Sequence, residues 1–169
     1  KRYMQKLIKN GVVSNDNWTV LKVASGPEVL QAAPGKAMII PLQLWKDFRE
    51  EVEEYTGSIA IWLDSNETVD RIGPDLHTLP LIALNFPAFS DGRSYTSARE
   101  LRESLNYEGE IRAIGDVLRD QIYYMSRCGF DSFALRHDQD PEACLAAFKD
   151  FKTGYQSSVA EPLPLFRRR

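Results

Sequence analysis

From residue 37 onward, short apolar runs alternate with longer amphipathic runs, and this rhythm limits the fold more than any other feature of the sequence. The apolar runs are typical of buried strands, and each is followed by apolar side chains that recur at helical spacing. The expected strands are 37–40, 58–63, 81–86, 111–114 and 132–135, and the expected helices are 42–55, 68–76, 96–106, 117–128 and 141–151. Strands that alternate with helices in this way predict parallel pairing and right-handed crossovers.

The expected fold is therefore α/β, with a mostly parallel sheet of about five strands flanked by helices. The continuous apolar run at Ile59–Leu63 is typical of a strand that is covered on both faces. The rhythm fits a doubly wound sheet and a partial (β/α) barrel equally well. Because 169 residues are too few for the eight units of a closed barrel, we expect an open or half-closed sheet.

The residues before this repeating region differ from it, and we expect a small β-rich segment over 1–36. Short strand-like runs flank Asn10-Gly11, a dipeptide that is typical of a tight hairpin turn. The α/β domain then covers 37–156. The last residues, 157–169, end in three arginines, and we expect a mobile tail or an electrostatic contact with a partner.

Three of the expected helices begin with recognisable capping residues. Ser97 with Glu100 fits a capping box. Asp116 precedes an expected helix and is placed to cap it. Asp140-Pro141-Glu142 places a cap residue, then proline at the first helical position, then an acid at the positive end of the helix dipole.

The composition favours a cytoplasmic globular protein. The net charge of −3 gives no overall attraction to nucleic acid or to an anionic membrane, so we expect neither as a partner. No apolar run approaches the roughly 20 residues that a membrane span needs, and no signal peptide is visible. Cys128 and Cys144 are too few for a disulfide framework, so we expect buried free thiols.

The segment Phe86–Arg99, between an expected strand and an expected helix, is richer in polar groups than a simple connection needs. The carboxyl ends of parallel strands share one edge, so polar side chains that follow different strands can converge there. The candidate ligand-binding residues are Asp91, Arg93 and Tyr95 after the third expected strand, and Asp116, Arg119 and Gln121 after the fourth.

Two arginines near helix N-termini favour a small anion as the ligand, because the helix dipoles add to their charge. Asp91 and Asp116 can orient Arg93 and Arg119 through bidentate pairs. Each residue also has a purely structural interpretation. Asp116 can simply cap a helix, the Asp91-Gly92 pair can simply form a turn, and Tyr95 can simply pack.

The sequence lacks the motifs of a self-contained redox enzyme. It has no glycine-rich dinucleotide fingerprint, no Walker A sequence and no Cys-x-x-Cys. The histidines His77 and His137 have no neighbour at metal-ligand spacing. We therefore expect no cofactor and no metal, and no residue is assigned as catalytic. Tyr123 and Tyr124 cannot both face inward on one helix, so we expect one to contribute to a contact surface.

Three blocks of the sequence resemble a known family in order and spacing. These are Leu79–Arg102, Gly109–Gln121 and Met125–Phe133, within a similarity that spans about residues 37–156. They closely resemble the bacterial DUF934 family. Its members are named as probable oxidoreductases involved in sulfite reduction, because their genes lie beside sulfite reductase or sulfate-assimilation genes. The resemblance implies a place in that pathway and gives the matching residues no individual roles.

Three functions fit these observations. The first, which we favour, is an accessory protein of assimilatory sulfite reduction that binds the sulfite reductase haemoprotein or its electron donor and holds a small oxyanion. The second is an oxidoreductase-type enzyme of the same pathway, in which Arg93, Arg119 and Arg136 bind the anion after three strand ends. Asp91 or Asp116 then acts as general base or orients one. The third is a structural partner protein without a ligand. Homo-oligomers are compatible with all three.

Overall fold

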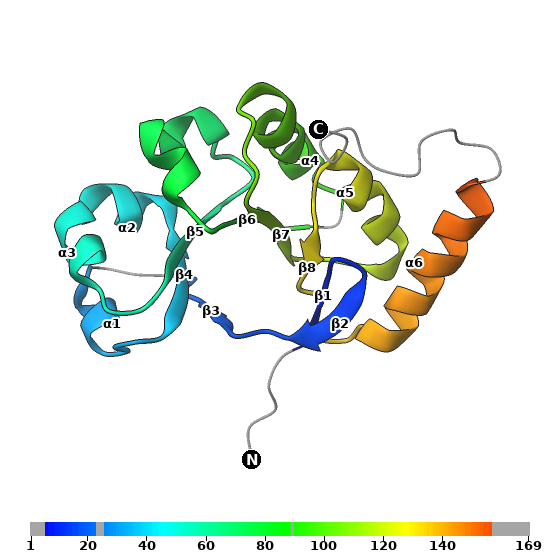
Figure 1. The fold of residues 1–169 in the computed structure, drawn as a ribbon, viewed down its shortest axis with the longest axis horizontal. Coiled ribbons are helices and arrows are strands. Elements are labelled where there is room, and N and C mark those ends of the chain that lie inside the picture. The colour runs from blue at the N-terminus through cyan, green and yellow to red at the C-terminus, as the bar shows by residue number, and fades with distance from the viewer. Residues whose placement is uncertain (1–5, 23–25, 89, 157–169) are drawn as a thin grey trace, which may run out of the picture.

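In the computed structural model, residues 6–22, 26–88 and 90–156 are described, and they form an α/β fold around one sheet (Figure 1). The strands are β1 (Lys6–Lys9), β2 (Val12–Asn15), β3 (Trp18–Val20), β4 (Ala37–Pro41), β5 (Ile59–Leu63), β6 (Leu81–Phe86), β7 (Glu110–Gly115) and β8 (Ser132–Phe133). The α-helices are α1 (Glu28–Gln31), α2 (Leu42–Asp47), α3 (Arg49–Glu54), α4 (Arg93–Arg99), α5 (Ile122–Cys128) and α6 (Pro141–Gln156). The 3₁₀ turns are η1 (Val69–Ile72), η2 (Pro74–Thr78) and η4 (Arg119–Gln121), and η3 (Glu100–Ser104) is a π-helix. The expected tail 157–169 lies outside the described residues.

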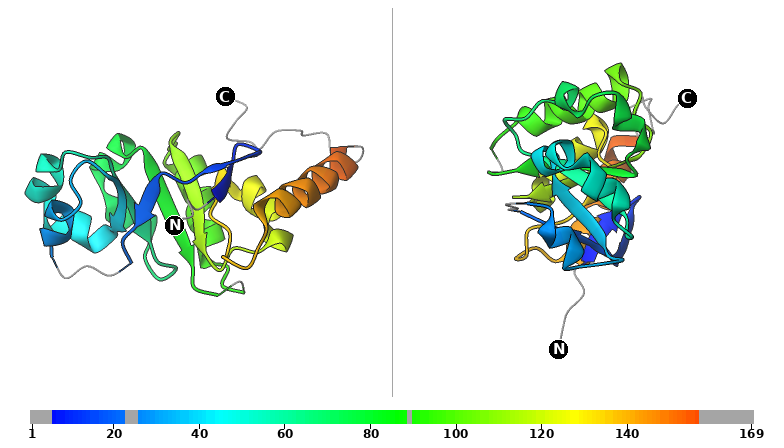
Figure 2. Two further views of the ribbon diagram at one scale, coloured as in Figure 1. Left: turned by 90° about the horizontal axis from the view of Figure 1, so that it is seen from below. Right: turned by 90° about the vertical axis from the view of Figure 1, so that its left-hand side faces the viewer.

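The α/β class is confirmed, but the sheet has eight strands rather than five, in the order β2-β1-β8-β7-β6-β5-β4-β3. From β3 to β8 all neighbours are parallel, whereas β1 is antiparallel to both β2 and β8. The parallel strands follow each other in chain order, so the strand order never reverses as it does in a doubly wound sheet. The sheet instead curls strongly into a half-barrel, with helices along its outer side (Figures 1 and 2).

The expected β-rich N-terminal segment contributes strands at both ends of this same sheet. Asn10 and Gly11 have positive φ angles of 52° and 79°, as a two-residue hairpin turn between β1 and β2 requires. The next stretch, 12–20, pairs with β1 over its first half and with β4 over its second half. Only two residues separate β2 from β3, so this one extended segment joins the two ends of the curled sheet (Figure 1).

The sheet is covered on both faces, as the continuous apolar strands predict. The outer cluster includes Ile61, Ile82 and Leu84 and packs under the helices. The smaller inner cluster contains Ile39, Ala60, Leu81, Ala83 and Ile114, with Trp18 and Val20 of β3 packed against it. Successive residues of β6 therefore alternate between the two clusters.

The helices depart most from the sequence expectations. The helix expected over 42–55 breaks at Phe48, whose backbone leaves the helical region at φ −125° and ψ 50°. The helix expected over 68–76 is two short 3₁₀ turns separated by Gly73. In each case the apolar spacing was sufficient to place a helical segment on the sheet but did not reveal where the backbone changes direction.

Two of the three predicted caps are wrong. Helix α4 begins at Arg93, so Ser97 lies inside it and the expected capping box with Glu100 is absent. Asp116 does not cap a helix, because two further residues precede η4 and its carboxylate accepts from Arg136 instead. The third prediction is confirmed: Asp140 Oδ1 accepts from the Glu142 N–H at 3.2 Å, at the start of α6.

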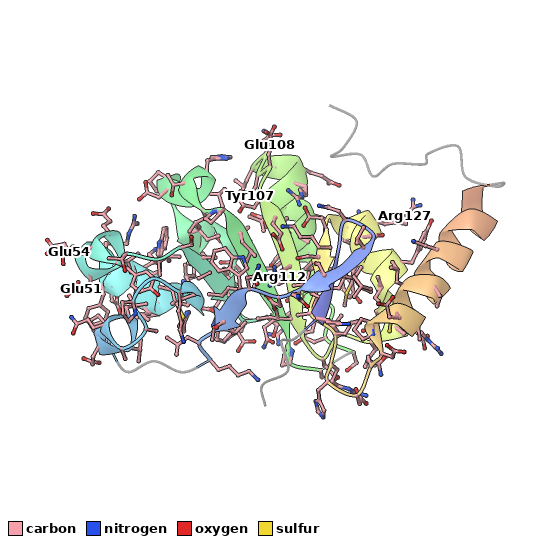
Figure 3. The ribbon with its side chains drawn as sticks, turned by 60° about the horizontal axis from the view of Figure 1, so that its bottom comes forward. Glu51, Glu54, Tyr107, Glu108, Arg112 and Arg127 are labelled. Atoms are coloured by element: carbon pink, nitrogen blue, oxygen red, sulfur yellow. The ribbon has the colours of Figure 1, made fainter. Side chains whose placement is uncertain are left out.

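A buried polar network lies inside the curl, centred on Arg112 of β7 (Figure 3). Its side chain is 2% exposed and binds Asp16 at 2.7 Å and Glu110 at 2.8 Å. The Ser132 hydroxyl also donates to Glu110, at 2.7 Å. Asp16 lies between β2 and β3, so Arg112 ties the segment that joins the two sheet ends to the middle of the sheet.

Candidate functional site

Polar residues gather at the carboxyl ends of the parallel strands, as the sequence predicts. Backbone hydrogen bonds hold the loops of neighbouring strands together there. The Asp116 N–H donates to the Phe86 carbonyl at 2.8 Å, and the Arg136 N–H donates to the Val117 carbonyl at 3.0 Å. The end of β6 and the loops after β7 and β8 are therefore fixed relative to one another. Their charged side chains form two groups.

The first group centres on Arg93, at the start of α4. Its guanidinium donates to both carboxylate oxygens of Asp91, from Nε at 3.1 Å and from Nη2 at 2.8 Å. Nη2 also donates to the Ser65 hydroxyl at 2.9 Å. The side-chain hydrogen bonds from Arg93 hold the pKa of Asp91 well below its usual range. The predicted bidentate pair of Asp91 and Arg93 is thus present.

Asn85 connects this group to the strands beneath it. Its Nδ2 donates to Asp64 Oδ1 at 3.0 Å, and its carbonyl accepts from the Ser94 hydroxyl at 2.8 Å. Gly115 lies against it with a φ of +92°, and a Cβ atom at that position would be 2.4 Å from Asn85 Oδ1. Glycine is therefore required at this point for both conformation and space.

The second group centres on Arg136, which follows β8. Its Nη1 donates to Asp116 at 2.8 Å, and its Nε and Nη2 donate to the two oxygens of Asp138 at 2.7 and 2.8 Å. The hydrogen bond from Arg136 lowers the pKa of Asp138 to about 2, and the two carboxylates raise the pKa of Arg136. Asp116 thus orients Arg136 rather than the predicted Arg119.

A shallow hollow of about 420 Å³ lies beside this second group. It is lined by Leu118, Arg119, Asp120, Arg136, Asp138, Gln139, Asp140, Ala143 and Cys144. The Arg119 side chain is 57% exposed, and its nearest carboxylate, Asp120, is 3.8 Å away. Cys144 is a free, buried thiol, as predicted, and burial raises its pKa although the charge of Arg119 opposes the shift.

The six predicted residues are therefore distributed among separate surroundings. Asp91 and Arg93 form the first group, whereas Arg119 lines the hollow and Asp116 holds another residue of that lining. Tyr95 packs edge-on against Phe86 and Tyr124, at ring-centroid distances of 5.1 and 4.9 Å, and burial raises its pKa. Gln121 ends η4. That these residues bind an anion stays a prediction.

The sequence analysis names Arg136 after the last expected strand but misses the two residues of the same loop, Asp138 and Gln139, that also line the hollow. Asp138 and Gln139 shape the hollow, and the Gln139 side-chain oxygen accepts from the Arg119 N–H at 3.1 Å. A signal was available, because this loop runs directly from the predicted strand-end Arg136 to the predicted cap Asp140.

Among the described residues, no group of three or more His, Cys, Asp and Glu side chains is arranged to hold a metal ion. None of the helices in the described ranges is long and apolar enough to cross a membrane.

Comparison with known proteins identifies the family. The profile of a family described as "Bacterial protein of unknown function (DUF934)" matches residues 60–166. The chain belongs to the DUF934 family. The match contains the loops after β6, β7 and β8, and therefore both charged groups of this DUF934 protein. A search of curated proteins finds no match.

Proposed function

We propose that this DUF934 protein is a non-catalytic accessory protein of assimilatory sulfite reduction. It binds the sulfite reductase haemoprotein or the electron donor of that enzyme. The pathway is supported by the genes that lie beside those of similar proteins. The binding role is supported by the ion pairs in which the carboxylates at the strand ends are held by arginines.

The observation that carries the proposal is the pairing of Asp91 with Arg93. A general base works best when its pKa lies near the working pH. Asp91 is held by two hydrogen bonds from one guanidinium, and its pKa lies well below its usual range. Such a carboxylate is a poor proton acceptor, and this favours a binding surface over an acid–base site.

A small oxyanion fits best in the hollow beside Arg119. Arg136 is already neutralised by Asp116 and Asp138, whereas Arg119 has one distant, exposed carboxylate. The start of α6 also contributes to the lining, and its dipole favours an anion. Because Asp138 and Asp140 line the same hollow, we expect weak binding of the anion.

The proposal is tested with the purified full chain and the purified haemoprotein and electron donor of the same bacterium. Analytical ultracentrifugation should detect a complex with one of the two at low salt. Calorimetric titration with sulfite should show weak binding that Arg119→Ala removes and Arg93→Ala leaves intact. If neither protein forms a complex with the chain, the accessory role is wrong.

The enzymatic alternative makes a different prediction in cells. If Asp91 or its arginine took part in catalysis, Asp91→Asn and Arg93→Ala would stop growth on sulfite. We expect both variants to support growth at the wild-type rate. Loss of growth with normal levels of folded protein would favour the enzyme. If the protein has a structural role without any ligand, Arg119→Ala should behave like wild type in the calorimetric titration with sulfite and in growth on sulfite.

A further inference from the structure

Tyr124 is a large apolar side chain that the fold leaves at the surface. It is 50% exposed, and it lies on α5 where that helix packs beside α4. Its ring contacts Tyr95, which contacts Phe86, which in turn contacts Phe130 at a centroid distance of 5.7 Å. The exposed ring is therefore held in place by a chain of edge-to-face and tilted aromatic contacts that reaches the core. A rigid, half-exposed tyrosine is typical of the centre of a protein interface.

Two arginines lie on the same face as Tyr124. Arg127 is one turn further along α5 and so lies on the same helix face as Tyr124. Figure 3 shows its side chain pointing away from the ribbon. Arg99 lies on α4, and hydrogen bonding to Tyr124 raises the pKa of Arg99.

The carboxylates near this face do not neutralise it. Glu103 reaches Arg99 at 4.0 Å, and both side chains are about half exposed, so the pair is weak. The contacts of Arg127 within the described chain are with Tyr123, through its hydroxyl at 3.4 Å and its ring, and none is with a carboxylate. Asp120, before α5, is accompanied by Arg119. The face is thus locally positive although the whole chain carries −3.

We propose that the α4–α5 face, defined by Tyr124, Arg99 and Arg127, is the surface on which this protein docks an acidic patch of its partner. The inference rests on the proposed accessory function and adds where the partner binds and with what charge. Tyr124 supplies the apolar anchor, and the two arginines supply carboxylate-binding forks at its rim. A partner surface rich in Asp and Glu complements this arrangement.

The test compares variants of the full chain for binding to the purified haemoprotein and electron donor, by biolayer interferometry at two salt concentrations. Tyr124→Ala should weaken the complex about tenfold or more, and Arg127→Glu should do the same by charge repulsion. Tyr124→Phe keeps the ring and should bind nearly as well as wild type. Circular dichroism spectra that match wild type would show that each variant is folded.

Val12→Ala and Lys22→Glu are the matched controls. Val12 is the other large hydrophobic exposed in the described chain, at 61%, and Lys22 is an exposed cation after β3. Both should bind like wild type. Binding should also weaken as salt rises, and less steeply for Arg127→Glu.

The outcomes separate the two proposals. If wild type binds a partner and the Tyr124 and Arg127 variants bind it equally well, the docking face is wrong and the accessory function stands. If wild type binds neither protein, both proposals are wrong. If Tyr124→Ala changes only the self-association of the chain, the face is an interface between copies and the acidic partner is wrong.

Discussion

Gly115 shows how one residue fixes the geometry of the site. Its φ of +92° disfavours any L side chain, and an added Cβ would lie 2.5 Å from the Phe86 carbonyl oxygen. We predict that Gly115→Ala destabilises the fold by about 3 kcal/mol, from backbone strain plus the clash. Gly35→Ala is the matched control, because its φ is +78° with open space around it, and it should cost only about 1 kcal/mol. Equal losses in urea unfolding would show that the clash is unimportant.

At the scale of single residues, the sequence predicted which charged residues lie at the strand ends better than it predicted which of them pair with each other. Asp91 and Arg93 are two residues apart, so their pairing was within reach of local reasoning. The pairing of Asp116 with Arg136 was not, because it joins loops that follow two different strands. Which carboxylate faces which guanidinium depends on how those strands are staggered, and apolar spacing carries no information on that.

At the scale of elements, the joining segment 12–20 depends on a buried ion pair. Asp16 is 8% exposed and faces Arg112. Removing one partner leaves the other buried and under-compensated. We therefore predict that Asp16→Ala costs about 3 kcal/mol of the free energy of unfolding. Asp47→Ala, which removes an exposed carboxylate bonded to Gln43, should cost no more than about 0.5 kcal/mol.

A second measurement tests whether the loss reflects opening of this segment. Hydrogen exchange should speed up in Asp16→Ala at the Leu21 N–H, which bonds to Ile39 after β3. Amides that join β6 to β7 should keep their protection. Uniformly faster exchange in both places would contradict a local role for the pair.

Strands and turns could be predicted from the sequence where interactions between residues close in the chain determine them. The five apolar runs became β4 to β8 because each strand must be buried on both faces, and the Asn10-Gly11 turn became a hairpin because its φ angles demand such residues. Strand β3 was missed as part of the main sheet. Its three residues pair with β4 across a connection that contains α1, and so short a strand has no periodicity of its own.

At the scale of the whole molecule, buried ion pairs and hydrogen bonds stabilise the inner side of the half-barrel in addition to apolar packing. Arg112, Glu110, Asp16 and Ser132 meet inside the curl. Burial pushes the pKa of Glu110 upward, but the hydrogen bond from Ser132 and the charge of Arg112 outweigh this effect and lower that pKa from its usual value. The folded state therefore favours the ionised form of Glu110. The free energy of unfolding consequently depends on pH through this buried network.

The sign of this linkage gives a prediction for the whole fold. A group whose pKa is lower in the folded state stabilises it above the unfolded pKa and loses that contribution as the pH falls. Glu110, Asp91 and Asp138 all have lowered pKa values. The free energy of unfolding, measured in urea, should therefore fall as the pH drops from about 5 to 2.

Glu110→Gln should lower stability at pH 5 and flatten this decline. Glu54→Gln, an exposed change of equal charge, should retain the full decline, and an equal decline in all three proteins would mean that the interior network does not sense pH.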